Sequence, residues 1–173
     1  EGLKQAEALV EFAATALPHP DGIISSDLGR CTAIARPLAA RLGVPLVCTP
    51  VLREQDMGEW EWKSWEELTV QDEQRVHDYW EDYLNTTPTG GESFADLAAR
   101  VAGWWASERD TLWGRRWIVV GHIGVIRSLL CQLFHHPLDQ ALRFAPMPGT
   151  HTHVLVAQSG ACLLYTSDAA DDS

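Results

Sequence analysis

Two spacings of hydrophobic residues divide most of the chain into helices and strands. Apolar residues recur every three or four positions in four segments, which predicts amphipathic helices at residues 3–17, 30–42, 93–112 and 125–133. Short apolar or alternating runs predict strands at residues 23–26, 45–49, 117–120 and 152–157. Because a helix joins the first two strands, we expect these strands to run parallel. The pattern predicts an α/β fold in one domain that spans residues 1–160.

Residues 56–92 break this alternation. The segment is polar and interrupted by glycines, and it predicts only short helices, at residues 64–68 and 71–84, followed by a loop. Several aromatic residues stand among its acidic ones: Trp60, Trp62, Trp65, Tyr79, Trp80 and Tyr83. Such a cluster is more often packing than ligand stacking, although it also suits the floor or lid of a site for a substrate with a ring. We expect a helical and loop excursion over the active-site end of the sheet.

The last residues, 163–173, follow neither spacing. They show no periodicity, and the final seven are all small or acidic. We expect a disordered end, or a junction that is not native to the protein.

Charge and composition exclude several classes of function. Acidic residues outnumber basic ones by 24 to 13, the net charge is −11, and no basic stripe is present, so nucleic acid is not expected as a partner. No apolar run reaches membrane-spanning length, so no membrane partner is expected. The four cysteines are scattered without a CxxC pair, which favours reduced thiols in the cytoplasm: Cys31, Cys48, Cys131 and Cys162.

Polar side chains with catalytic potential stand where three predicted strands end. His122 follows strand 117–120, Arg30 follows strand 23–26, and Glu54 comes a few residues after the second strand. Open α/β sheets form their ligand sites at the carboxyl ends of strands, beside helix N-termini. Each residue alone has an ordinary explanation: a capping or core histidine, a surface salt bridge and a solvated carboxylate. In this order they favour a site in which Arg30 binds phosphate and Glu54 acts as a general acid.

Four ordered motifs resemble those of the histidine phosphatase superfamily, the phosphoglycerate mutase-like phosphatases. They are Ser25-Ser26-Asp27-Leu28-x-Arg30, Leu52-Arg53-Glu54 with Gly58-x-Trp60-Glu61, Pro88-x-Gly90-Gly91-Glu92-Ser93, and Gly121-His122-x-Gly124-Val125-Ile126-Arg127. The resemblance runs from Glu1 to about Val156 and is closest to the α-ribazole phosphatase and broad-specificity phosphatase branch. It implies a three-layer α/β/α sandwich with a mostly parallel central sheet.

The resemblance also implies the chemistry. It implies a phosphomonoester hydrolase that works through a phosphohistidine, with no cofactor and no metal. Glu54 and His122 would be catalytic, while Arg30 and Gly124 would bind the substrate. The implied partner is a small phosphorylated metabolite, with α-ribazole 5′-phosphate as the first candidate.

The family's nucleophilic histidine belongs to an Arg-His-Gly segment at the end of the first strand, and this sequence does not contain that segment. Glu1 begins what resembles the helix after that strand, so we expect a missing piece of roughly 20 residues, one strand and its connection. The chain alone would then be inactive. The alternative is a phosphate-binding or scaffold protein that keeps the fold without turnover. Trp62 and Ile123 stand where the family usually has glycine, but neither removes a charged group.

The remaining histidines carry weaker signals. His151 and His153 share one face of a predicted strand, and His135 precedes His136, which raises the possibility of a metal site. No cysteine or carboxylate stands at ligand spacing beside them, so zinc is not expected. By the family pattern, the region of His151 would border the substrate pocket.

Overall fold

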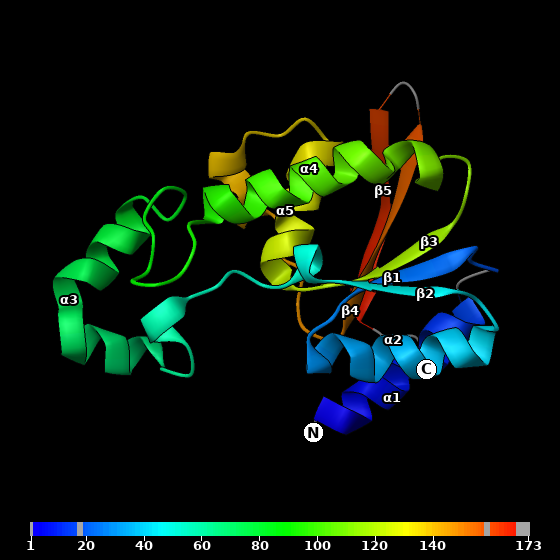
Figure 1. The fold of residues 1–173 in the computed structure, drawn as a ribbon, viewed down its shortest axis with the longest axis horizontal. Coiled ribbons are helices and arrows are strands. Elements are labelled where there is room, and N and C mark those ends of the chain that lie inside the picture. Colours follow the sequence, from blue (N-terminus) through cyan, green and yellow to red (C-terminus); the bar gives the residue numbers. More distant parts are fainter. Residues whose placement is uncertain (1, 17–18, 158–159, 169–173) are drawn as a thin grey trace.

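The chain folds into alternating helices and strands, as the spacing of its hydrophobic residues predicts. A computed structural model describes residues 2–16, 19–157 and 160–168 (Figure 1). Its helices are α1 (Gly2–Ala16), α2 (Gly29–Leu42), α3 (Trp65–Glu81), α4 (Phe94–Leu112) and α5 (Ile123–Leu133). Its strands are β1 (Gly22–Ser26), β2 (Leu46–Thr49), β3 (Trp117–Val120), β4 (Thr150–Ala157) and β5 (Gly160–Asp168). Short 3₁₀ turns are η1 (Pro50–Leu52), η2 (Gly58–Trp60) and η3 (Leu138–Arg143).

A parallel sheet lies between two helical layers. Its strand order is β2-β1-β3, and β1 pairs in parallel with both neighbours. Figure 1 shows α1 and α2 on one side of this sheet and α4 and α5 on the other. Successive residues of a strand point to opposite faces, so Ile23 packs with Val10 and Leu38 of the first layer, while Ile24 packs with the second. The fold class implied by the sequence is confirmed.

The β4–β5 hairpin forms a second, antiparallel sheet. Within the described residues it does not pair with β3, whose only strand partner is β1. The side chains of Val119 on β3 and Leu155 on β4 are 37% and 56% exposed. Two apolar strands therefore face solvent in part where a larger sheet would bury them.

The prediction of a disordered end is wrong for residues 163–168, which form most of β5. Their backbone pairs with β4 along the whole hairpin, and the run contains β-favouring residues such as Tyr165 and Thr166. Their high β propensity and the pairing with β4 favour a strand here, although apolar and polar residues do not alternate in the sequence. Residues 169–173 lie outside the described part of the chain.

Helix α3 belongs to the excursion between β2 and α4, which extends to one side of the molecule (Figure 1). The sequence predicts two short helices here, and α3 does consist of two helical parts, because Asp72 between them has a non-helical backbone (φ −157°, ψ 76°). The excursion has its own small core of Trp60, Leu68, Val76 and Tyr79. The packing role expected for the aromatic residues therefore holds for Trp60 and Tyr79, whereas the indole of Trp62 is 97% exposed.

Local signals in the sequence explain where several helices begin and end. Ser93 caps α4 in a capping box: its Oγ accepts the N–H of Asp96 at 3.1 Å, and the Asp96 carboxylate accepts the N–H of Ser93 at 3.0 Å. Gly43 ends α2 in the left-handed conformation (φ 66°), while Pro37 is accommodated inside that helix. Among the described helices, none is both long and apolar enough to cross a bilayer.

Candidate active site

His122 lies at the junction of β3 and α5, at the centre of the candidate site. The residue is the N-cap of α5, and its side chain is buried. Its Nδ1 lies 3.1 Å from Nε of Arg30, and its Nε2 lies 2.9 Å from Oγ of Ser26. A guanidinium cannot accept a hydrogen bond, so Nδ1 must be the acceptor. The neutral ring consequently carries its proton on Nε2, directed at Ser26.

Burial and positive charge both oppose protonation of this ring. Burial has the largest effect on the pKa of His122, and the charges of Arg30 and Arg100 add to it, so the pKa is lowered to about 4. The site thus presents a neutral imidazole beside a permanent cation. A bound oxyanion would offset the cation and favour the protonated ring.

Cys31 is a neighbour of His122 that the sequence motifs do not indicate. Its Sγ lies 3.4 Å from Nε2 of His122 and 3.6 Å from the carbonyl oxygen of Gly121. Burial raises the pKa of the Cys31 thiol, which keeps it protonated and poorly nucleophilic. The thiol therefore packs against the imidazole rather than supplying a nucleophile.

Glu54 approaches the same helix end from the segment after η1. Its Oε1 and Oε2 lie 3.2 and 3.3 Å from the backbone nitrogen of Gly124, and Oε1 also accepts the N–H of Gln55 at 3.0 Å. The first turn of α5 favours a carboxylate because its N–H groups lack partners within the helix. A Cβ atom on Gly124 would lie 2.5 Å from Oε1 of Glu54, so this approach requires glycine. In this structure Gly124 thus binds Glu54, whereas the sequence predicts a contact with substrate.

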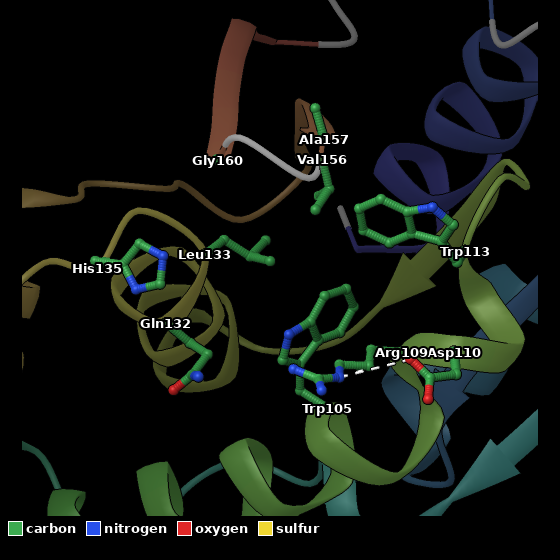
Figure 2. A pocket seen from close by; sticks show the side chains of 10 residues that line it. All are labelled: Trp105, Arg109, Asp110, Trp113, Gln132, Leu133, His135, Val156, Ala157 and Gly160. Atoms are coloured by element: carbon green, nitrogen blue, oxygen red, sulfur yellow. Dashed lines mark ion pairs between the residues drawn. The ribbon is translucent and has the colours of Figure 1, made fainter.

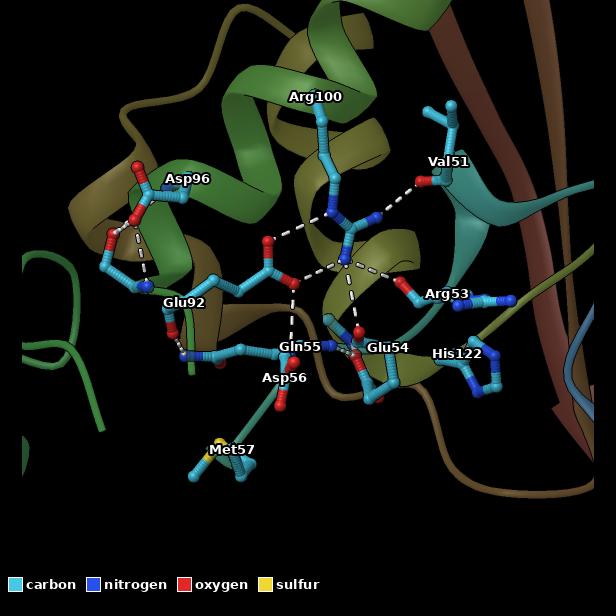
Figure 3. A network of polar contacts seen from close by, with 12 residues as sticks. Val51, Arg53, Glu54, Gln55, Asp56, Met57, Glu92, Asp96, Arg100 and His122 are labelled. Carbon is cyan, nitrogen blue, oxygen red and sulfur yellow. Dashed lines mark hydrogen bonds and ion pairs between the residues drawn. The ribbon is translucent and has the colours of Figure 1, made fainter. Parts of the chain in front are cut away.

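Arg100 is the main residue that the sequence analysis missed. It projects from α4, and its Nε and Nη2 donate to the Glu92 carboxylate at 3.1 and 2.6 Å (Figure 3). Nη2 also donates to the carbonyl oxygens of Arg53 at 2.8 Å and Glu54 at 3.2 Å, and Nη1 donates to that of Val51. One guanidinium therefore joins α4, the loop before α4 and the segment that carries Glu54.

Arg53 points away from this network, toward the rim of the site. Its Nε and Nη2 donate to the two carboxylate oxygens of Asp27 at 2.7 and 2.6 Å. Both side chains are partly exposed to solvent, Arg53 to 52% and Asp27 to 29%. The pair links the turn after β1 to the segment after η1 without contacting His122 or Glu54 through its side chains.

The other sequence candidates are histidines on β4 and just after α5. His151 and His153 are on β4, where the ring of His151 packs against Phe12 with ring centroids 4.4 Å apart. In the part of the chain that is described, no three His, Cys, Asp or Glu side chains gather as metal ligands. A cavity of about 520 Å³ opens between the hairpin and the C-terminal ends of α4 and α5, with Trp105, Leu133 and Val156 among its walls (Figure 2).

Comparisons with known proteins identify the family of the chain. Residues 1–168 match the histidine phosphatase superfamily (branch 1). The adenosylcobalamin/α-ribazole phosphatase of Salmonella typhimurium is 28% identical over 173 residues, covering 98% of this chain and 83% of that protein. The solved structure of a mycobacterial glucosyl-3-phosphoglycerate phosphatase with inorganic phosphate has a TM-score of 0.80 at 26% identity, covering 96% of this chain and 86% of that one.

A third comparison concerns the fold alone. The α-ribazole phosphatase structure from Shigella flexneri has a TM-score of 0.83 at 24% identity, covering 93% of this chain and 79% of that one. The family match covers far more than half of the sequence, and the structural neighbours have a similar overall fold. The chain belongs to the histidine phosphatase superfamily.

Proposed function

We propose that this protein hydrolyses phosphomonoesters of small metabolites, with Arg30 and His122 binding the phosphoryl group and Glu54 acting as the acid and base. One observation carries the proposal: Arg30 contacts His122 at 3.1 Å, and Glu54 contacts the amide of Gly124 on the same helix end. Two groups that can bind an oxyanion thus lie next to one carboxylic acid. This is the combination that transfer of a phosphoryl group from an alkoxide requires.

The proposed reaction has two steps. A histidine nitrogen forms a bond to phosphorus as the bond to the ester oxygen breaks, and the protonated Glu54 gives its proton to the leaving alkoxide. Water then attacks the phosphohistidine after losing a proton to the Glu54 carboxylate, and inorganic phosphate leaves. Arg30 and a protonated His122 stabilise the charge on the non-bridging oxygens in both transition states.

The nucleophilic histidine of this scheme is proposed to lie on a strand outside the 173 residues. None of the contacts of His122 is with another histidine among the described residues. A further strand that paired with β3 would end at the same edge of the sheet as His122. The free edge of β3, the separate hairpin and the cavity beside that hairpin support this position. The chain by itself is then inactive.

The proposed substrate is α-ribazole 5′-phosphate or a related ester with a ring system. The name of the relative in Salmonella typhimurium supports this choice. The exposed indole of Trp62 supplies a surface on which a base could stack. Free thiols at all four cysteines support a cytoplasmic enzyme.

The test is an assay of phosphate release with two proteins, the full-length product of the gene and residues 1–173 alone. We expect the full-length protein to hydrolyse α-ribazole 5′-phosphate and other esters, and the shorter protein to hydrolyse none. No release by a folded full-length protein would contradict the proposed activity and favour a phosphate-binding scaffold. Hydrolysis by residues 1–173 would contradict the external nucleophile.

A further inference from the structure

Arg100 donates to the backbone carbonyl oxygen of Glu54 rather than to its carboxylate (Figure 3). We propose that Arg100, paired with Glu92, is a positioning residue that holds the Glu54 carboxylate against the N-terminus of α5. This inference rests on the proposed role of Glu54 as the proton donor. Nothing in the sequence motifs or the relatives' names assigns a role to Arg100.

The contacts of Arg100 converge on the short segment that carries the acid. Its guanidinium donates hydrogen bonds to the carbonyl oxygens of Val51, Arg53 and Glu54, which are three of the four carbonyl oxygens of residues 51–54. The planar guanidinium makes these contacts possible, with the two N–H groups of Nη2 shared among three acceptors, whereas the ammonium of lysine has only three donors around one point. The segment is otherwise a short 3₁₀ turn and a loop, so few backbone bonds of its own fix its position.

The carboxylate of Glu54 depends on that backbone. It accepts hydrogen bonds from the amides of Gly124 and Gln55, and no cationic side chain in the described part of the chain contacts it. Gly124 is part of a helix, so the distance between carboxylate and amide changes whenever the segment at residues 53–54 moves. General acid catalysis is sensitive to shifts of about 1 Å, because the proton must be transferred to one oxygen of the substrate.

Glu92 completes the arrangement. Its carboxylate balances the charge of Arg100 and also accepts the N–H of Asp56 at 3.1 Å, and the N–H of Glu92 donates to Asp56 at 2.9 Å. Residues 56 and 92 are the two ends of the excursion that contains α3. Gly91 allows this close pairing, since a Cβ atom there would lie 2.2 Å from the carbonyl oxygen of Asp56. Arg100 therefore connects three parts of the protein: the segment that carries Glu54, helix α4, and the two ends of the excursion.

The amide resonance of Gly124 in ¹⁵N-labelled residues 1–173 tests the inference without any need for turnover. Glu54→Ala defines the shift of an amide that has lost its carboxylate. We expect Arg100→Ala to move the Gly124 shift to that value, and Arg100→Lys to move it part of the way. Arg109→Ala is the matched control, because Arg109 is on the same helix and, within the described residues, forms an ion pair with its neighbour Asp110 alone. It should leave Gly124 unchanged.

An unchanged Gly124 resonance in folded Arg100→Ala would overturn the inference. If Arg100→Ala does not fold, Glu92→Gln decides, because it keeps the shape of Glu92 and removes only its charge. A folded Glu92→Gln protein should show a smaller shift in the same direction, and no shift there would count against the inference.

Kinetics of the full-length protein give a second readout. A p-nitrophenolate leaves without protonation, whereas the alkoxide of ribose 5-phosphate needs the acid. We expect Arg100→Ala to lower kcat/KM for ribose 5-phosphate by roughly tenfold or more relative to kcat/KM for p-nitrophenyl phosphate, because kcat/KM reports the first step and hydrolysis of the phosphohistidine is common to both esters. Equal losses with both esters would indicate a structural role and overturn the inference. If the unaltered protein hydrolyses neither ester, the proposed function fails, while the Gly124 measurement still decides the role of Arg100.

Discussion

The two halves of the site are held in place by different kinds of contact. In the histidine half, which we define as Ser26, Arg30 and His122, side chains contact one another directly. In the glutamate half, defined as Glu54, Glu92 and Arg100, most bonds run from one guanidinium to backbone carbonyls and to a second carboxylate.

This difference separates binding groups from their support. A phosphoryl group bound in the histidine half would contact Arg30 and His122, the same side chains that contact each other in this structure. In the glutamate half Arg100 and Glu92 bond to each other and to the backbone of the segment that carries Glu54. Substitutions in the first half should therefore affect phosphate binding, and those in the second should affect proton transfer.

The largest expected effect is that of Glu54→Gln in the full-length protein. The amide keeps the shape of the side chain but cannot donate a proton to an alkoxide, so kcat for alkyl phosphates should fall by roughly 10²- to 10⁴-fold. Inhibition by inorganic phosphate should stay unchanged, because the histidine half is intact. Steady-state kinetics measure both quantities. Weaker inhibition by phosphate with kcat preserved would mean that Glu54 binds the phosphoryl group, and the distinction between the halves would fail.

The histidine half should have a signature in the pH dependence of folding. The pKa of His122 is about 4 in the folded protein, against an ordinary value of 6.5. Between these pH values the unfolded chain binds a proton at this residue and the folded chain does not, so stability falls as the pH is lowered. The loss attributable to His122 is about 2 kcal/mol from pH 7 to pH 5 and about 3 kcal/mol in full.

Urea unfolding of residues 1–173 at pH 7, 6 and 5, in buffers free of phosphate, measures this loss. His122→Gln cannot ionise and serves as the reference, so the difference in slope between the two proteins isolates the histidine. Equal slopes would show that the ring is protonated, or free to become so, in the folded state.

The histidine half could be predicted from the sequence because its geometry follows from the fold. Arg30 and His122 each stand just after a short apolar strand, and parallel strands bring their carboxyl ends to one edge of the sheet. The prediction of β1 and β3 was sufficient to bring these two side chains together. Glu54 follows β2 in the same way, so its place near the edge could also be predicted.

The support of the glutamate half could not be predicted in this way. Arg100 occupies the middle of an amphipathic helix, where an arginine ordinarily indicates only a polar face. Its targets are backbone carbonyls, which any residue supplies, so no side-chain motif marks them. Glu92 stands eight residues before Arg100. It could be predicted to pair with Arg100 only if the conformation of the turn between the two residues were known. The contact between Gly124 and Glu54 was likewise hidden, because it joins a backbone amide to a residue 70 positions away.

A smaller effect is expected from Arg30→Lys, which tests the histidine half from the ligand's side. Lysine keeps the positive charge but loses the planar pair of donors that suits two phosphate oxygens. Inhibition of the full-length enzyme by inorganic phosphate should weaken by roughly tenfold, while the kcat ratio between alkyl and nitrophenyl esters stays constant. A changed ratio would mean that Arg30 also acts on proton transfer, which would join the two halves.

The smallest effect is expected at the rim, where Asp27 and Arg53 form an exposed ion pair between the two halves. Solvent screens such a pair, and neither side chain contacts His122 or the carboxylate of Glu54, so Asp27→Asn should change kcat/KM by no more than about twofold. Thermal unfolding should be indistinguishable from that of the unaltered protein. The comparison with Arg100 is instructive because Arg53 adjoins Glu54 in the chain and Arg100 does not. Asp27→Asn could instead lower activity as much as Arg100→Ala does. The position of Glu54 would then depend on its neighbour Arg53 in the chain, and not on the backbone contacts of Arg100.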